Sequence, residues 1–154
     1  DAPAAPVGIP GEVFVVADVP TGMKHLAFVA RDLGDAWLLA ADATSTALIR
    51  FDGATVESQP LPKFQGAARS IAATSDGTLW FVSANSIFKR KPSGEWEEVP
   101  PPTRQFPEPD PKWEFFEVGA GGADVWISAK HASSTASRFV VLRQRPAKEV
   151  VRWP

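Results

Sequence analysis

Short apolar runs, each flanked by residues that favour turns, recur along the chain. In the segment SDGTLWFV, residues 75–82, the pair Asp76-Gly77 is a strong hairpin signal, because glycine tolerates the positive φ of tight hairpin turns. The apolar run over residues 79–82 predicts a short buried strand, and RSIAAT, residues 69–74, predicts the strand that pairs with it. The pattern of this region therefore favours antiparallel β-structure.

The same order of turn and apolar run occurs three times, each time with a tryptophan inside the run. These tryptophans are separated by 43 and 46 residues: Trp37, Trp80 and Trp126. Two further strand-like segments follow each of them, and each unit ends at a proline, which suits an outer strand because proline cannot donate to the next strand. We therefore predict three units of four short strands, at about residues 26–62, 69–102 and 113–154.

The second unit carries a recognisable blade pattern. Its sequence IAATSDGTLWFVSANSIFKRKPSGEWEEVPP, residues 71–101, resembles blades of the tectonin and two-component-regulator types of β-propeller, in which D-G-x-x-W opens the second strand and G-x-W the fourth. The resemblance extends over about residues 26–154, and the spacing of the units is that of propeller blades. It implies an all-β fold of propeller-like, four-stranded antiparallel repeats.

Three blades do not close a ring, since propellers have about four to eight. We therefore expect either an incomplete ring, as a piece of a larger propeller, or a ring completed by another chain. Two copies of this chain would give about six blades. The alternative architecture is an open β-sandwich, which would need no repeat in the sequence.

The remaining segments fit around these units within a single all-β repeat domain, residues 11–154. The proline-rich residues 1–10 predict a disordered or extended lead-in. Residues 11–20, GEVFVVADVP, resemble the last strand of a unit and predict an orphan outer strand. Residues 100–112, PPPTRQFPEPDPK, predict an extended connection between the second and third units.

Composition narrows the class of protein. The net charge of −2 and the scattered lysines and arginines argue against a nucleic-acid partner, and no apolar run approaches the length of a membrane span. The absence of cysteine excludes disulfides and thiolate metal sites. The small, proline-rich first residues resemble the N-terminus of an exported bacterial protein. We therefore expect a periplasmic or extracellular location, with the cytoplasm as the alternative.

Candidate binding residues come from the repeat and from the outer strands. We expect Trp37, Trp80 and Trp126 to pack between neighbouring blades. Five residues beyond these tryptophans stand polar residues that we expect to open equivalent loops on one rim: Asp42, Asn85 and His131. Three further tryptophans lie where a partner could reach them. Trp96 and Trp153 belong to predicted outer strands, and Trp113 follows the proline-rich connection.

No catalytic signature accompanies these residues. The sequence has no G-x-S-x-G, H-E-x-x-H or P-loop motif and no D-x-D-x-D-G calcium loop, so we assign no catalytic residue, metal or cofactor. Asp52 and Asp76 are better explained as turn residues. We expect a non-catalytic binding or scaffold module that acts through protein–protein contacts, with a second copy or a second chain as partner. The alternatives are a glycan-binding lectin and a propeller hydrolase or lyase.

Overall fold

The computed structural model describes residues 19–32, 34–102, 112–133, 137–144 and 151–152, and these form strands joined by turns. The first four strands are β1 (Lys24–Asp32), β2 (Asp35–Ala41), β3 (Thr46–Phe51) and β4 (Val56–Gln59). The next four are β5 (Ala68–Ala73), β6 (Leu79–Ser83), β7 (Ile87–Arg90) and β8 (Trp96–Val99). The last four are β9 (Lys112–Gly121), β10 (Asp124–Ala132), β11 (Ser137–Gln144) and β12 (Val151–Arg152).

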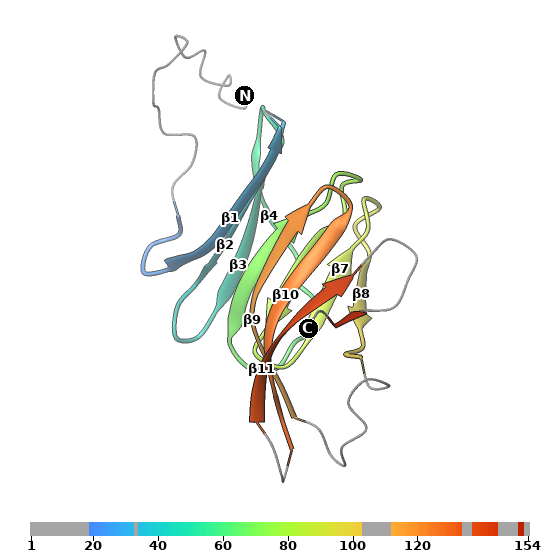
Figure 1. Ribbon diagram of the computed structural model, residues 1–154. Helices are drawn as coiled ribbons and strands as arrows, with labels where there is room; N and C mark the ends of the chain where they lie inside the picture. The colour runs from blue at the N-terminus through green and yellow to red at the C-terminus, as the bar shows by residue number, and fades with distance from the viewer. Residues whose placement is uncertain (1–18, 33, 103–111, 134–136, 145–150, 153–154) are drawn as a thin grey trace, which may run out of the picture. The chain divides into compact units, whose positions relative to one another are not determined.

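These strands make three separate sheets, each of four consecutive antiparallel strands in sequence order (Figure 1). Each sheet is a simple meander, which is the topology of a propeller blade. The prediction of an all-β fold built from three four-stranded repeats is therefore confirmed. A β-sandwich would instead place strands in two sheets packed face to face, so the alternative architecture is not the one that forms.

The chain divides into two compact units, residues 1–61 and residues 62–154. The first unit contains β1–β4, and the second contains β5–β8 and β9–β12. The predicted lead-in at 1–10, most of the orphan strand at 11–20 and residues 103–111 of the proline-rich connection lie outside the described residues.

Aspartates shape the turns between strands. Asp52 accepts hydrogen bonds from the backbone N–H groups of Ala54 and Thr55, at 3.0 and 2.7 Å, between β3 and β4. Asp76 accepts from Thr78 N at 3.0 Å and from Thr74 Oγ1 at 2.6 Å, between β5 and β6, and Gly77 beside it has φ of 87°. The prediction that these two aspartates serve turns is confirmed, because short polar side chains that bond to nearby backbone stabilise such bends.

A β-bulge occurs at the same place in the first strand of every sheet. The second strand of each sheet contains the repeat tryptophan. In each sheet the register of the first strand shifts opposite two residues of that second strand, namely the second and the third after the tryptophan. The residues inserted by these shifts are Leu26 in β1, Arg69 in β5 and Phe116 in β9. Because a bulge bends its strand and increases the local twist, the three sheets share a backbone deformation as well as a sequence pattern.

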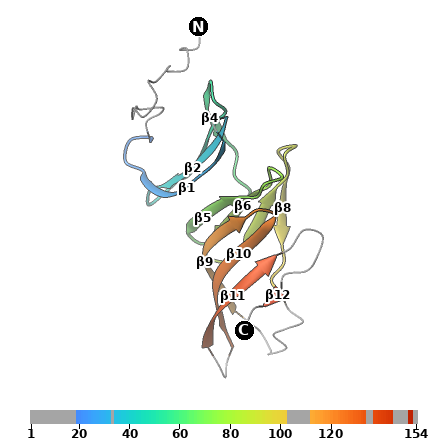
Figure 2. The ribbon, with the colours of Figure 1, turned by 45° about the horizontal axis from the view of Figure 1, so that its top comes forward.

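The second unit is held together by contact between two sheets. Strand β5 lies next to β9, and Arg69 forms an ion pair with Glu114 at 3.4 Å between them (Figure 2). The backbone N–H of Ser75 donates to the carbonyl of Gly122 at 2.8 Å, which links the β5–β6 turn to the β9–β10 turn. A shared apolar core fills the space between the two sheets.

Candidate functional site

Each sheet has two faces, and the repeat tryptophan defines one of them. We call the face that carries this tryptophan the Trp face and the other the opposite face. On β5–β8 the Trp face includes Trp80, 5% exposed, and Val82, fully buried. These side chains share one apolar core with Val125 and Ile127 from the opposite face of β9–β12, each 1% exposed. Within the second unit, therefore, the Trp face of one sheet is covered by the opposite face of the next.

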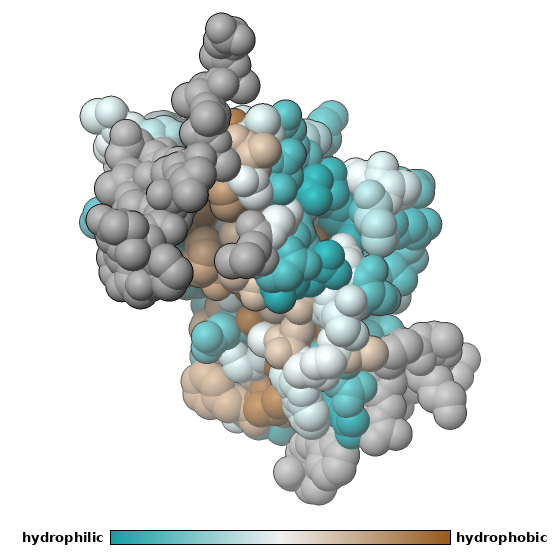
Figure 3. Space-filling model, turned by 90° about the horizontal axis from the view of Figure 1, so that it is seen from above, coloured by the Kyte–Doolittle hydropathy of each residue, from teal (hydrophilic) through white to brown (hydrophobic). Residues whose placement is uncertain are grey.

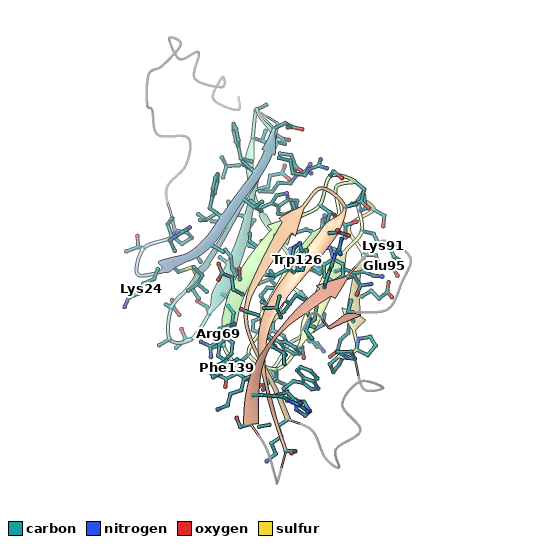
Figure 4. The ribbon with its side chains drawn as sticks, viewed as in Figure 1. Lys24, Arg69, Lys91, Glu95, Trp126 and Phe139 are labelled. Carbon is teal, nitrogen blue, oxygen red and sulfur yellow. The ribbon has the colours of Figure 1, made fainter. Side chains whose placement is uncertain are left out.

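The Trp face of β9–β12 has a different environment. Trp126 is 36% exposed, Val141 46% and Phe139 77%. The register places these residues on one face, because Trp126 pairs with Arg143, Ser128 with Val141 and Lys130 with Phe139 across β10 and β11. Figure 4 labels Trp126 and Phe139 on these neighbouring strands. We call Trp126, Phe139 and Val141 the exposed aromatic face.

The indole of Trp126 is held in place although it is partly exposed. Arg143 lies over its ring, with 4.9 Å between the guanidinium carbon and the ring centroid, and forms an ion pair with Asp124. The guanidinium is attracted to the negative face of the aromatic ring. The same arrangement occurs in the first sheet, where Arg50 lies 5.3 Å from the Trp37 centroid and contacts Asp35 at 3.3 Å.

The opposite face of β1–β4 also exposes apolar side chains. Phe28, 61% exposed, pairs with Leu38 across β1 and β2, and Val56, 43% exposed, pairs with Phe51 across β3 and β4. Leu38 pairs in turn with Ile49. We call Phe28, Leu38, Ile49, Phe51 and Val56 the first-sheet apolar face. Brown, apolar surface is visible among polar residues in Figure 3.

Asp42 has a structural role in its turn. Its carboxylate accepts hydrogen bonds from the backbone N–H groups of Thr44 and Ser45, at 2.7 and 2.8 Å, and from both hydroxyls. The backbone hydrogen bonds from Thr44 and then Ser45 lower the pKa of Asp42 below its ordinary value. The geometry places this side chain against its own loop, which explains its presence without a ligand.

Asn85 and His131 do not occupy positions equivalent to Asp42. In the first sheet, the backbone N–H of Asp42 donates to Ser45 O at 3.0 Å across the turn after β2. In the second sheet, the corresponding bond after β6 runs from Ser83 N to Ser86 O at 3.0 Å, so Ser83 is the residue that corresponds to Asp42. Asn85 is an exposed turn residue two positions later. His131 lies inside β10 and is 1% exposed, so the expectation that it opens a loop is wrong. Strand lengths after the tryptophan differ, and counting five residues does not align the three sheets.

The structure brings His131 together with one other predicted residue. Trp113 lies directly opposite it across β9 and β10, and the two rings meet edge to face with centroids 4.8 Å apart. Trp113 also stacks on Phe115 at 6.0 Å. Trp96, at the start of β8, packs its ring edge against the buried Phe81 at 6.2 Å. Trp153 lies outside the described residues.

Of the exposed aromatic face, the sequence pattern pointed only to Trp126 and left Phe139 and Val141 unassigned. We expected Trp126 to be buried between neighbouring blades, and this expectation fails for the third sheet, where Trp126 is partly exposed. An aspartate stands two residues before the tryptophan in both DAW, residues 35–37, and DVW, residues 124–126, but Trp37 is only 5% exposed, so this motif does not mark the exposed tryptophan. Phe139 and Val141 carry no such local signal, because their exposure depends on what covers the whole sheet.

Metal-binding clusters and membrane-spanning helices are both absent from the described residues. In the part of the chain that the structure describes, no group of three or more His, Cys, Asp or Glu side chains is placed to hold a metal ion. Among the same residues, no helix has the length and apolar character to cross a membrane.

Comparison with solved structures identifies the fold. The chain is similar to virginiamycin B lyase from Staphylococcus aureus, with 14% identity and a TM-score of 0.50, over 90% of this chain and 58% of the lyase chain. It is similar to YCF48 bound to D1 peptide, with 13% identity and a TM-score of 0.51, over 90% of this chain and 56% of the other. Both are β-propeller proteins, so the three sheets are propeller-type blades. No protein-family model and no curated protein matches the sequence.

The chain thus spans less than two thirds of the length of either solved propeller. At this level of identity the likeness extends to the fold and no further, since one fold hosts many functions.

Proposed function

We propose that this chain is a non-catalytic binding module that acts through protein–protein contacts, and that the exposed aromatic face is its contact surface. The observation that carries the proposal is the exposure of Trp126, Phe139 and Val141 on a face whose counterpart in the preceding sheet is covered. The partner is a second copy or another chain that presents a propeller-type sheet.

The chemistry of this face supports a protein partner. Large aromatic side chains and arginine are the residues enriched at the centres of protein interfaces. Trp126 and Arg143 are already arranged by the ion pair with Asp124, so they lose little freedom on binding. Burial of an exposed phenylalanine such as Phe139 contributes roughly 1.5–3 kcal/mol.

Site-specific photocrosslinking tests the proposal. A photoreactive amino acid at position 139 is compared with the same amino acid at position 95, in cells that produce the full-length protein. Glu95 lies in the β7–β8 hairpin of the same compact unit with a side chain 70% exposed, and both positions are labelled in Figure 4. We expect protein adducts from position 139, identified by mass spectrometry, and few from position 95.

Equal adduct yields at the two positions, or none at position 139, would show that the exposed aromatic face is not the contact surface. The lectin alternative makes a different prediction. If the chain binds glycans, a broad glycan array gives signal that Trp96→Ala or Trp113→Ala removes and Phe139→Ser leaves unchanged.

A further inference from the structure

We propose that the exposed aromatic face binds the first-sheet apolar face of a second copy of this chain, so that two copies join head to tail. The inference rests on the proposed function and names its partner. It follows from how sheets already pair inside the molecule, from which faces are left exposed, and from the chemistry of those faces.

The first step is the pairing rule that the second unit displays. There, a Trp face meets an opposite face: Trp80 and Val82 share a core with Val125 and Ile127. The contact is apolar at its centre, and an ion pair between Arg69 and Glu114 lies beside it at 3.4 Å. A Trp face is therefore complementary to the opposite face of another blade.

Second, the sheets differ in which of their faces expose apolar residues. The Trp face of the first sheet is buried, with Trp37 at 5% and Leu39 and Leu48 at 0% exposure. Among the strand residues that the structure describes, large exposed apolar side chains lie on the Trp face of the third sheet and on the opposite face of the first sheet. One face of each kind is thus available, which is the combination that the pairing rule requires.

The third step is the match in chemistry. The first-sheet apolar face has phenylalanine, leucine, isoleucine and valine on adjacent strands, with Ser58 beside Ile49 at the outer strand. On the exposed aromatic face, the charge of Arg143 is balanced by Asp124. The same face also carries Lys130, opposite Phe139, and Glu117, opposite Ser128, and these two charges are of opposite sign. Joining the two faces therefore buries apolar area without adding a net charge, and an unpaired buried charge is the main penalty for burying ionic groups.

The fourth step concerns symmetry. A contact between two different faces closes on itself in a pair of copies when a two-fold rotation relates them, because each copy then presents one face of each kind to the other. Two copies would contribute two identical contacts and, from the described residues, six sheets, which lies within the range of about four to eight blades in closed propellers.

The test uses two variants of the full chain, each with a single aspartate on one of the two faces. Phe28→Asp blocks the first-sheet face and Val141→Asp blocks the aromatic face; both native side chains are well exposed, so the fold should tolerate the changes. Val19→Asp is the matched control, since Val19 is 37% exposed and lies in none of the sheets. Circular dichroism and thermal melting verify that each variant is folded.

Light scattering over a wide range of concentrations gives the result. We expect the native chain and Val19→Asp to reach twice the 16.6 kDa chain mass. We expect each face variant to dimerise at least about tenfold more weakly, because a charge placed in an apolar contact is costly. Mixing Phe28→Asp with Val141→Asp should restore dimers, because the mixed pair contains one contact between two unaltered faces.

Three results would overturn the inference. A native chain that stays monomeric at every concentration would exclude a second copy as the partner. In that case, a photocrosslinked adduct from position 139 to a different protein would still support the proposed function. Dimers that Val141→Asp abolishes and Phe28→Asp leaves intact would show that two aromatic faces pair with each other instead. Failure of the mixture to recover dimers would exclude the head-to-tail arrangement.

Discussion

Arg143 lies over the indole of Trp126 in the third sheet, and Arg50 lies over the indole of Trp37 in the first, at 4.9 and 5.3 Å. In both sheets the arginine is directly opposite the tryptophan on the next strand. An aspartate two residues before each tryptophan contacts that arginine. These contacts hold the indole in one orientation relative to the sheet. The first and third sheets therefore share the orientation of the tryptophan as well as its position in the sequence.

The aspartate of this arrangement should matter most in the first sheet. Asp35 is buried and accepts from Trp37 Nε1 at 2.9 Å and from Arg31 Nε at 2.6 Å, in addition to its contact with Arg50. Asp35→Asn removes the charge while keeping the size of the side chain. We expect it to lower the free energy of unfolding by about 2 kcal/mol, since hydrogen bonds to charged groups contribute roughly 1.5–3 kcal/mol.

Urea denaturation of the two proteins measures this difference. The matched control is Asp32→Asn in the same compact unit, because Asp32 is exposed and its bond from Gly34 N, at 2.7 Å, can also be made by an asparagine oxygen. We expect this control to change stability by less than about 0.5 kcal/mol. Equal effects at the two positions would contradict the role given to Asp35.

Acid should weaken the fold through its turn aspartates. Hydrogen bonds from the backbone of Thr55 and then Ala54 lower the pKa of Asp52 below its ordinary value of 3.8. The folded state therefore binds this proton less readily than the unfolded state. The stabilisation is fully present above the unfolded pKa and is lost as the pH falls through the lower folded pKa.

The variant Asp52→Asn isolates this effect, because asparagine can accept the same backbone hydrogen bonds but does not titrate. We expect the urea midpoint of the native protein to fall between about pH 6 and about pH 3, and that of the variant to fall less. Other carboxylates, including Asp42 and Asp76, whose pKa values are also lowered, account for the remaining loss. Identical losses in the two proteins would exclude Asp52 as a contributor.

The aromatic cluster of the second sheet should dominate the stability of its unit. Phe81 is fully buried and contacts Phe64, Phe88 and Trp96, with centroid distances of 5.0, 6.0 and 6.2 Å. We expect Phe81→Ala to cost about 3–5 kcal/mol, because truncating a buried phenylalanine leaves a cavity. Calorimetric melting of the variant should show a large fall in Tm.

Phe139→Ala is the matched control for this measurement, since Phe139 is 77% exposed. At a concentration low enough to exclude association, we expect its cost to stay within about 1 kcal/mol, most of it from the lost contact with Phe116 at 6.0 Å. Similar falls in Tm for the two alanine variants would mean that Phe81 is not the centre of this core.

Local signals in the sequence were enough to predict the architecture. The tryptophan spacing and the turns at Asp52 and Asp76 depend on residues near one another in the chain, and the structure confirms them. The bulges at Leu26, Arg69 and Phe116 depend on pairing between strands and have no such signal. The expectation that Asp42, Asn85 and His131 open equivalent loops failed for the same reason. Pairing with the neighbouring strands decides where β2, β6 and β10 end, and this pairing keeps His131 inside β10.

Glycine at position 66 should tolerate substitution less well than glycine at position 122. Both have positive φ, at 77° and 63°, where any other residue is strained. A Cβ at Gly66 would lie 3.0 Å from the Cβ of Ala84 and 3.2 Å from Asn85 Nδ2, whereas a Cβ at Gly122 would meet nothing within 4 Å. Backbone strain is common to both variants, and the contact with the β6–β7 turn is particular to Gly66.

We therefore expect Gly122→Ala to cost about 1 kcal/mol and Gly66→Ala to cost about 1 kcal/mol more. Urea denaturation of the two variants compares them within one compact unit. The turn beside Gly66 also bonds the neighbouring sheet, because Ala84 O accepts from Phe115 N at 2.9 Å. A shift of that turn would loosen the contact between β6 and β9, and hydrogen exchange at the Phe115 amide should then be faster in Gly66→Ala but unchanged in Gly122→Ala. Equal costs with equal exchange would show that the turn moves aside freely.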